Sequence, residues 1–413
     1  MRWLLIPALL LLLGCDDKAT SSPEPTSASA TSTAAATSTT AAKPAGPKLY
    51  ERVVMSPVYQ VDKIYKSMRG PNHTDELALL KADEPELLWI VSFEATMVDK
   101  AGDKPMSQEF MCHTNLDMDA SQHRELFGAD KQVSGRLFTL SQGQYRIDMP
   151  KGYGIPMLST ELISVNTQVL NLNMKDGKAE VRHRVVMRYH RDSELNKPMK
   201  ALYVGGAFGL KLLDGKDGHH GLSHDEADGG HGDQHTACLP GANAGKNSFD
   251  DGHGRTFTGH WVVEPGREVN HTRVTELMDM PFDTTLHYVA VHLHPFAETL
   301  ELKDLTSGKT VYKAKTRQAD KGVGLAHVDF FSSEKGIPIH KDHEYELVSV
   351  YENTSGEPQD SMAVMNLYLL DKEFKKPDLT KVKARLEKLK KTEAAPAASG
   401  SASAHDHHDH GAM

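Results

Sequence analysis

The sequence predicts an all-β protein with two β-sandwich domains of jelly-roll-like arrangement. Segments rich in β-branched and aromatic residues run through most of the chain, and turns rich in Gly, Asp, Asn and Pro separate them. Amphipathic helical patterns are scarce before Asp378. Many short strands with few helices are typical of sandwiches. The predicted strands cover residues 87–98, 162–174, 181–190, 286–294, 299–305, 310–315, 344–351 and 363–370.

A break in composition separates the two predicted sandwiches, which we place at 48–210 and 258–375. Residues 211–257 are rich in Gly, Asp and His and show no periodic apolar pattern, so we expect a long loop. His-rich tracts often bind transition metals weakly, and a solvated, disordered loop is the alternative. The loop histidines are His219, His220, His224, His231, His235 and His253.

The start of the chain has the layout of a secretory signal, residues 1–15. Arg2 precedes an apolar run that ends in Leu12-Leu13-Gly14-Cys15 and is too short to span a membrane. This pattern resembles that of bacterial lipoproteins, in which lipidation of the cysteine, here Cys15, anchors the mature protein. The resemblance implies a lipid-anchored protein of the bacterial cell envelope that faces the periplasm or the cell surface. A soluble secreted protein is the alternative.

Low-complexity segments flank the predicted sandwiches. Residues 16–47 are almost entirely Ser, Thr, Ala, Pro and Lys, which cannot bury a core, so we expect a disordered tether. Residues 376–413 begin with a charged stretch at 378–391, for which we expect a solvated helix. They end in a His-rich tail with His405, His407, His408 and His410.

Charge and cysteine content narrow the partners and the compartment. The formal net charge is −9, and no basic stripe with interleaved aromatic residues is found, so we expect no nucleic acid partner. Beyond Cys15, the chain contains Cys112 and Cys238. In an oxidising compartment the two can form a disulfide, and metal ligation or unpaired thiols are the alternatives.

The most specific chemical signal is His292-Leu293-His294, followed along the chain by Met362. Side chains on a strand alternate between faces, so the two histidines point to one site. Two imidazoles with a thioether favour Cu(I), because harder metals select carboxylate, water or thiolate instead. We predict that His292, His294 and Met362 bind copper, with Met365 as an alternative to Met362. The competing interpretation is two half-exposed histidines and a core methionine.

The segments between residues 87 and 370 resemble the copper type II, ascorbate-dependent monooxygenases, the family of peptidylglycine α-hydroxylating monooxygenase and dopamine β-monooxygenase. Residues 261–266 resemble the family's strand and Pro-Gly turn, and residues 288–294 resemble its His-x-His segment. Residues 351–362 are similar to the part that delivers the methionine. The resemblance implies that His292, His294 and Met362 bind catalytic copper, with ascorbate or another reductant as electron donor.

The first half departs from this family pattern. Residues 150–154 resemble a family motif, but the family's adjacent histidine pair is Cys112-His113 here, and its third histidine is Leu170, or Asn166 if the alignment slips. One interpretation is an altered copper site of Cys112, His113 and a histidine such as His123 or one from the loop. A second is that a disulfide to Cys238 places the loop beside His113. The third is that the second copper site is lost.

Substrate recognition departs as well. The family's peptide hydroxylases place an arginine two residues before the first copper histidine, and this chain has Ala290 there. Loss of that charge-assisted anchor argues against glycine-extended peptides as substrates. The sequence does not identify the substrate, which can be a small molecule or another peptide. Two functions follow: a copper-dependent monooxygenase, or a non-catalytic copper-handling lipoprotein that uses the same site together with the histidines of the loop and tail.

Overall fold

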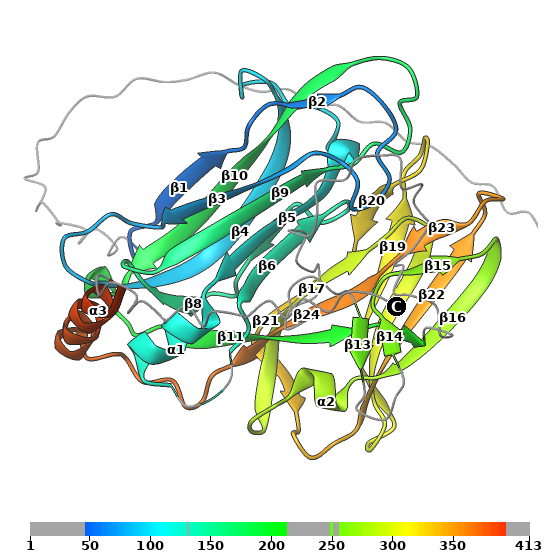
Figure 1. Ribbon diagram of the computed structural model, residues 1–413. Coiled ribbons are helices and arrows are strands. Elements are labelled where there is room, and N and C mark those ends of the chain that lie inside the picture. The colour runs from blue at the N-terminus through cyan, green and yellow to red at the C-terminus, as the bar shows by residue number, and fades with distance from the viewer. Residues whose placement is uncertain (1–45, 130, 132, 213–247, 251–255, 394–413) are drawn as a thin grey trace, which may run out of the picture. The chain divides into compact units, whose positions relative to one another are not determined.

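The structure is a computed structural model that describes residues 46–129, 131, 133–212, 248–250 and 256–393 (Figure 1). Strands dominate these residues and helices are few and short, so the predicted all-β class is confirmed. The signal with Cys15, the tether, most of the His-rich loop with Cys238, and the His-rich tail lie outside the described residues.

The largest sheet runs through both halves of the chain. Its hydrogen-bonded order is β1 (Tyr50–Met55), β10 (Ala179–Arg191), β4 (Leu87–Asp99), β8 (Tyr153–Leu158), β11 (Lys200–Phe208), β24 (Ala363–Leu370), β17 (Thr284–Leu293) and β21 (Phe331–Ile339), with β2 (Tyr59–Val61) on β10 and β7 (Arg146–Asp148) on β4. The strand β11 pairs in parallel with β8 and antiparallel with β24. The strand β11 lies in the predicted first domain, which ends at position 210, and β24 lies in the second. Their pairing joins the two halves of the chain in one sheet.

Two further sheets pack on this long sheet. One has four strands in the order β3 (Asn72–Ala78), β9 (Leu162–Val169), β5 (Met111–Met118) and β6 (Arg136–Ser141). The other has five strands in the order β16 (Gly266–Arg273), β22 (Tyr345–Asn353), β18 (Ala297–Asp304), β19 (Lys309–Gln318) and β20 (Leu325–Val328). Short pairings join β15 (Trp261–Val263) to β23 (Gln359–Ser361), and β14 (Thr256–Thr258) to β12 (Lys211–Leu212) and β13 (Ser248–Asp250).

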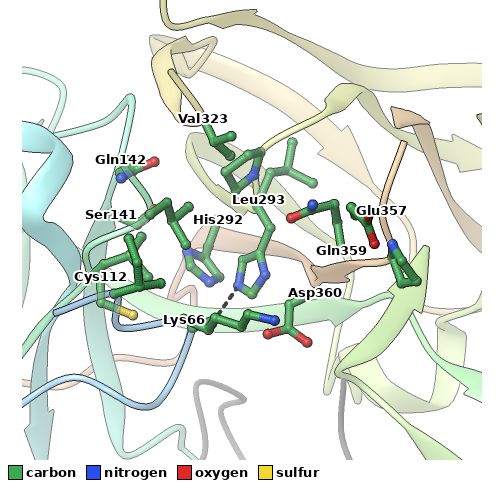
Figure 2. A pocket seen from close by; sticks show the side chains of 17 residues that line it. Lys66, Cys112, Ser141, Gln142, His292, Leu293, Val323, Glu357, Gln359 and Asp360 are labelled. Carbon is green, nitrogen blue, oxygen red and sulfur yellow. Dashed lines mark hydrogen bonds between the residues drawn. The ribbon is translucent and has the colours of Figure 1, made fainter. Parts of the chain in front are cut away.

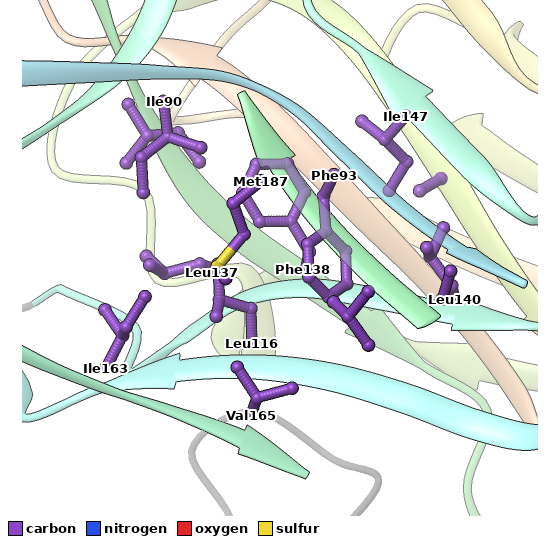
Figure 3. Packing of buried hydrophobic residues seen from close by; sticks show 14 of the residues in the cluster. Ile90, Phe93, Leu116, Leu137, Phe138, Leu140, Ile147, Ile163, Val165 and Met187 are labelled. Carbon is purple, nitrogen blue, oxygen red and sulfur yellow. The ribbon is translucent and has the colours of Figure 1, made fainter. Parts of the chain in front are cut away.

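Each half has its own hydrophobic core. In the first half, Phe93 and Met187 of the long sheet meet Leu116, Phe138 and other side chains of the four-stranded sheet (Figure 3). The second core lies between the long sheet and the five-stranded sheet.

The strand β17 contributes to both cores, because its side chains alternate between faces. Tyr288 and Ala290 belong to the first core, whereas Val289, Val291 and Leu293 belong to the second. His292 follows Ala290 by two residues, so its side chain lies on the same face as Tyr288 and Ala290 and points toward the first half.

The helices are α1 (Ala120–Phe127), α2 (Thr275–Met278) and α3 (Leu379–Glu393), with 3-10 turns at Gln108–Phe110 and Asp192–Glu194. Helix α3 confirms the predicted helix, and most of its described side chains are exposed, as expected of a solvated helix, although one apolar residue docks it on the protein. Its Val382 is buried against Leu126 and Leu158, and its Arg385 donates a 2.8 Å hydrogen bond to the Leu126 carbonyl. None of the helices found in the described ranges is long and apolar enough to cross a membrane.

Candidate metal centre

The end of β17 places His292 and the following His294 on one face of the long sheet. His292 pairs with Val364 of β24, and the intervening Leu293 pairs with Ala363. Leu293 and Ala363 both pack in the second core, so the histidines point the other way, toward the first half. Both imidazoles are buried, with exposures of 4% and 6%.

Of the two candidate methionines, Met362 shares the face of the histidines. It lies between β23 and β24, and the β17–β24 register, carried on by one residue, sets it opposite His294. Its side chain is 2% exposed and clusters with Phe208 and Val364. Residues directly opposite in antiparallel strands project to the same face, and Val364 is the partner of His292.

Met365 points to the opposite face. It pairs with Val291 and with Ala207, and all three side chains belong to the second core. Met365 is therefore separated from the histidines by the sheet itself, and Met362 is the methionine that the fold brings to them.

His292 shows a feature that suits a metal ligand. Both of its ring nitrogens are buried and have no hydrogen-bond partner among the described residues. A buried polar group without a partner costs about 1–3 kcal/mol, and coordination would offset this cost. Burial, followed by the charges of His294, His113 and His260, holds the pKa of His292 well below its ordinary value of 6.5. The ring thus stays neutral, which is the form that binds metals.

His294 is held in a way that is typical of ligating histidines. Burial lowers its pKa to about 4, and a hydrogen bond with the Asp360 backbone opposes this shift. Its Nε2 lies 3.5 Å from the Ser67 hydroxyl. The ring centroids of His292 and His294 are 5.3 Å apart. Metal-bound histidines usually donate the second ring N–H to a carbonyl or carboxylate, which fixes the tautomer.

A cavity of about 360 Å³ adjoins the two histidines, and both halves of the chain line it. Figure 2 shows His292 with Cys112 and Ser141 from the first half, and with Asp360 from the second. Met362 is not part of the wall. Lining residues from the first half are Ile64, Lys66, Ser67, Cys112, Ser141, Gln142, Leu170 and Leu172, and those from the second are His292, Leu293, His294, Pro295, Val323, Glu357, Pro358, Gln359 and Asp360.

Within the part of the chain that the structure describes, no three His, Cys, Asp or Glu side chains stand close enough together to hold a metal ion. A methionine thioether is a further, softer kind of ligand. The arrangement at the end of β17 is of another kind, with two imidazoles and a methionine. This donor set suits Cu(I) and fits few other biological metals.

The first-half residues that the family pattern singles out do not form a group of three metal ligands within the described ranges. Cys112 is the extra residue of a β-bulge between Met111 and His113, and it lines the cavity. His113 Nε2 lies 3.2 Å from Asn166 Oδ1, so an amide lies beside His113 at the position that the alternative alignment gives to the family's third histidine. Leu170 lines the cavity and offers no donor atom.

The structure does not bring His123 to Cys112 and His113. Its Nδ1 lies 2.7 Å from Glu161 Oε1, and the ring lines a different cavity. The loop and Cys238 lie outside the described residues, so the predicted disulfide and loop ligands stay predictions.

Sequence reasoning missed two buried histidines. His183 Nδ1 lies 2.9 Å from the Thr114 hydroxyl, and burial, with the charge of His113 second, lowers its pKa to about 3. The ring centroid of His260 lies 5.3 Å from that of His294. In the sequence, the only indication that His260 belongs to this region is its position directly before β15, whose residues resemble the family's strand and Pro-Gly turn.

Comparison with known proteins identifies no relative. No protein-family model matches the chain, and no curated protein matches it. Among solved structures, the STIV MCP has 9% identity and a TM-score of 0.29 over 78% of this chain and 96% of that chain. The major capsid protein P2 from bacteriophage PM2 has 7% identity and a TM-score of 0.28 over 78% and 99%. TM-scores this low indicate no shared function.

Proposed function

We propose that the protein binds one copper ion through His292, His294 and Met362 and uses it for a monooxygenase-type oxidation of a substrate in the adjoining cavity. The observation that carries this proposal is the buried His292 ring, whose two nitrogens have no hydrogen-bond partner among the described residues. Met362 on the same face supplies the soft ligand that selects copper. The resemblance to copper type II, ascorbate-dependent monooxygenases supports the same assignment.

His292, His294 and Met362 would hold the copper, which would supply one-electron redox chemistry toward dioxygen. The balanced reaction converts a C–H bond, dioxygen, two electrons and two protons into a C–OH group and water, with ascorbate or another reductant as electron source. The chain's own residues hold the imidazoles neutral and aimed. His294 is positioned by the Asp360 backbone, and His292 stays unprotonated because it is buried.

The cavity indicates a small, largely apolar substrate. Its volume of about 360 Å³ lies at the lower end of the range for small-molecule sites, roughly 300–1,000 Å³. Leu170, Leu293 and Val323 supply apolar wall, and Lys66 and Asp360 contribute charged groups. Ala290 is fully buried in the first core and does not line the cavity, so its position offers no carboxylate anchor.

A second candidate is a copper-handling protein that performs no oxygen chemistry. It is favoured by the first half, where His113 faces Asn166 in place of a third imidazole, because an oxidation needs two electrons and a single copper stores one. The histidines of the loop and tail add further weak copper ligands. In either case we propose a lipid-anchored protein of the bacterial envelope, on the basis of the Leu12–Cys15 pattern.

The test uses the full chain with its loop and tail histidines replaced by serine, here called the tract-silenced chain. Those positions are His219, His220, His224, His231, His235, His253, His405, His407, His408 and His410. Competition with a colorimetric Cu(I) chelator should give one tight site per chain. Substitution His292→Ala or His294→Ala should weaken it by more than about 100-fold, since even outer-shell changes typically cost 10–100-fold.

Oxygen uptake with ascorbate separates the two candidate functions. A monooxygenase should consume oxygen in a copper-dependent manner, and a small apolar substrate should increase the rate. The matched control is His287→Ala, because His287 is also buried on β17 but bonds to the Ser333 carbonyl at 2.9 Å. One tight copper without His292-dependent oxygen uptake would favour copper handling, and unchanged copper affinity in both site variants would overturn the proposal.

A further inference from the structure

We infer that His260 is a third imidazole ligand of this copper, so that the centre is formed by three histidines and one methionine. This inference rests on the proposed copper site. It assigns a role to a residue outside the motifs that pointed to that site.

Ring positions are the first observation. His294 stands between the two other rings: its centroid lies 5.3 Å from that of His260 at an interplanar angle of 82°, and 5.3 Å from that of His292 at 83°. With metal–nitrogen bonds of about 2.0–2.1 Å, two imidazoles at a tetrahedral angle around one metal have ring centres roughly 5 Å apart. Both neighbouring pairs therefore have the spacing of rings that share a metal.

The relative positions of the His260 and His292 rings are what must change. The three rings as they stand do not form a ligating group by themselves, as the absence of a three-residue His, Cys, Asp or Glu set in the described ranges shows. Ligation by all three rings therefore requires a side-chain rotation. The two strand registers indicate that His260 and β17, which carries His292, lie beside the same segment around Met362. His260 also contributes to the electrostatic field at His292.

Strand register is the second and independent observation. Trp261 of β15 pairs with Ser361 of β23, and that register, carried on by one residue, sets His260 opposite Met362. The β17–β24 register does the same for His294 on the other side. Met362 thus lies where the two ladders meet, with one imidazole on either side.

The local structure holds His260 in this place. Its backbone N–H donates to the Thr258 hydroxyl at 3.1 Å, and that hydroxyl donates back to the His260 carbonyl at 2.7 Å. The next residue, Trp261, is buried and its indole N–H donates to Glu268 at 2.9 Å. His260 itself is 3% exposed. A buried imidazole on a backbone fixed on both sides is the arrangement expected of a pre-organised ligand.

A third imidazole has a functional consequence. His260 would add a third imidazole to the residues that hold the copper. It would therefore strengthen copper retention and slow the copper-dependent uptake of oxygen.

The experiment compares the tract-silenced chain with its His260→Ala and His260→Phe variants, the second of which preserves volume if the first does not fold. X-ray absorption of the Cu(I)-loaded protein should show three imidazole nitrogens and one sulfur in the parent, and two nitrogens and one sulfur in the variants. Cu(I) affinity should fall by about 10-fold or more in the variants, and ascorbate-dependent oxygen uptake should rise. The control is His271→Ala, whose side chain is 54% exposed on β16.

The outcomes distinguish this inference from the proposed function. A parent with two imidazoles and one sulfur, unchanged by His260→Ala and lost in His292→Ala, would overturn the role of His260 and leave the copper site intact. A parent whose Cu(I) spectrum is unchanged in His292→Ala, His294→Ala and His260→Ala alike would overturn both.

Discussion

The hydroxyl of Tyr351 donates a hydrogen bond to the backbone carbonyl of Met362, and the same hydroxyl lies 3.5 Å from the backbone nitrogen of His294, which donates to it. Tyr351 is 1% exposed, so no water competes for this group. One phenol thus ties the residue that carries the proposed thioether ligand to the residue that carries an imidazole ligand. Burial raises the pKa of Tyr351, so the hydroxyl keeps its proton throughout the physiological range.

Substitution Tyr351→Phe should weaken Cu(I) binding by about 10–100-fold, the usual effect of losing an outer-shell partner. The Met362 carbonyl would lose its donor, and the segment between β23 and β24 would loosen. Chelator competition measures the change. Tyr345→Phe is the matched control, because Tyr345 is equally buried and its hydroxyl bonds to the His340 carbonyl at 2.9 Å. Equal copper affinity in both variants would contradict the bridging role.

The two methionines should differ in their effect on copper. Met362→Leu removes the thioether at nearly constant volume and should lower Cu(I) affinity sharply while Cu(II) affinity changes little, because thioethers prefer the reduced ion. Met365→Leu should leave both affinities unchanged, since its side chain packs in the second core. X-ray absorption should show loss of the sulfur only in Met362→Leu. The reverse pattern would mean that the register at β24 differs from the one described.

The histidine pair could be predicted from sequence because alternation along a single strand is a local property. His292 and His294 need only β17 to share a face, and the strand was visible in its own residues. The choice of Met362 over Met365 needed the pairing of β24 with β17, which a one-residue shift would reverse. His260 was missed for the same reason, because it reaches the site through the separate β15–β23 ladder.

The shared sheet and the first-half site show the same limit. Two sandwiches could be predicted from turn spacing. The parallel pairing of β11 with β8 could not, because neither segment contains a sequence pattern that specifies its partner strand. The bulge that leaves Cys112 out of the β5–β9 register likewise cannot be recognised from the Cys112-His113 dipeptide. Helix α3 was expected to be solvated because its charges outnumber its apolar residues, and its docking through Val382 and Arg385 could not be predicted from that composition.

Stability should fall as the pH drops below about 6.5. The folded-state pKa of His294 is about 4 and that of His183 is about 3, both because of burial, whereas the unfolded chain titrates near 6.5. Between these values the unfolded state binds more protons, so acid favours unfolding, and the effect levels off below the folded-state pKa. Each unit of difference corresponds to about 1.4 kcal/mol.

Urea denaturation at pH 7.5, 6.0 and 5.0 measures this effect. The midpoint should decrease steadily, and His183→Gln should make the decrease shallower because it removes one of the buried neutral rings. Bound Cu(I) should oppose the decrease, since copper competes with protons for the imidazoles. A midpoint that does not change with pH would show that these rings are not held neutral in the folded state.

Gln144 connects the first half to the strand that carries the copper ligands. Its side-chain oxygen accepts a 3.1 Å hydrogen bond from the Val291 backbone, and its side-chain nitrogen donates to the Tyr288 hydroxyl at 3.2 Å. Because Val291 directly precedes His292, Gln144→Leu should cost about 1–3 kcal/mol of stability and also reduce Cu(I) affinity. Gln108→Leu, which breaks hydrogen bonds to Met97 inside the first half, should cost stability alone. If both variants lost stability and neither lost copper affinity, β17 would hold His292 in place without help from the first half.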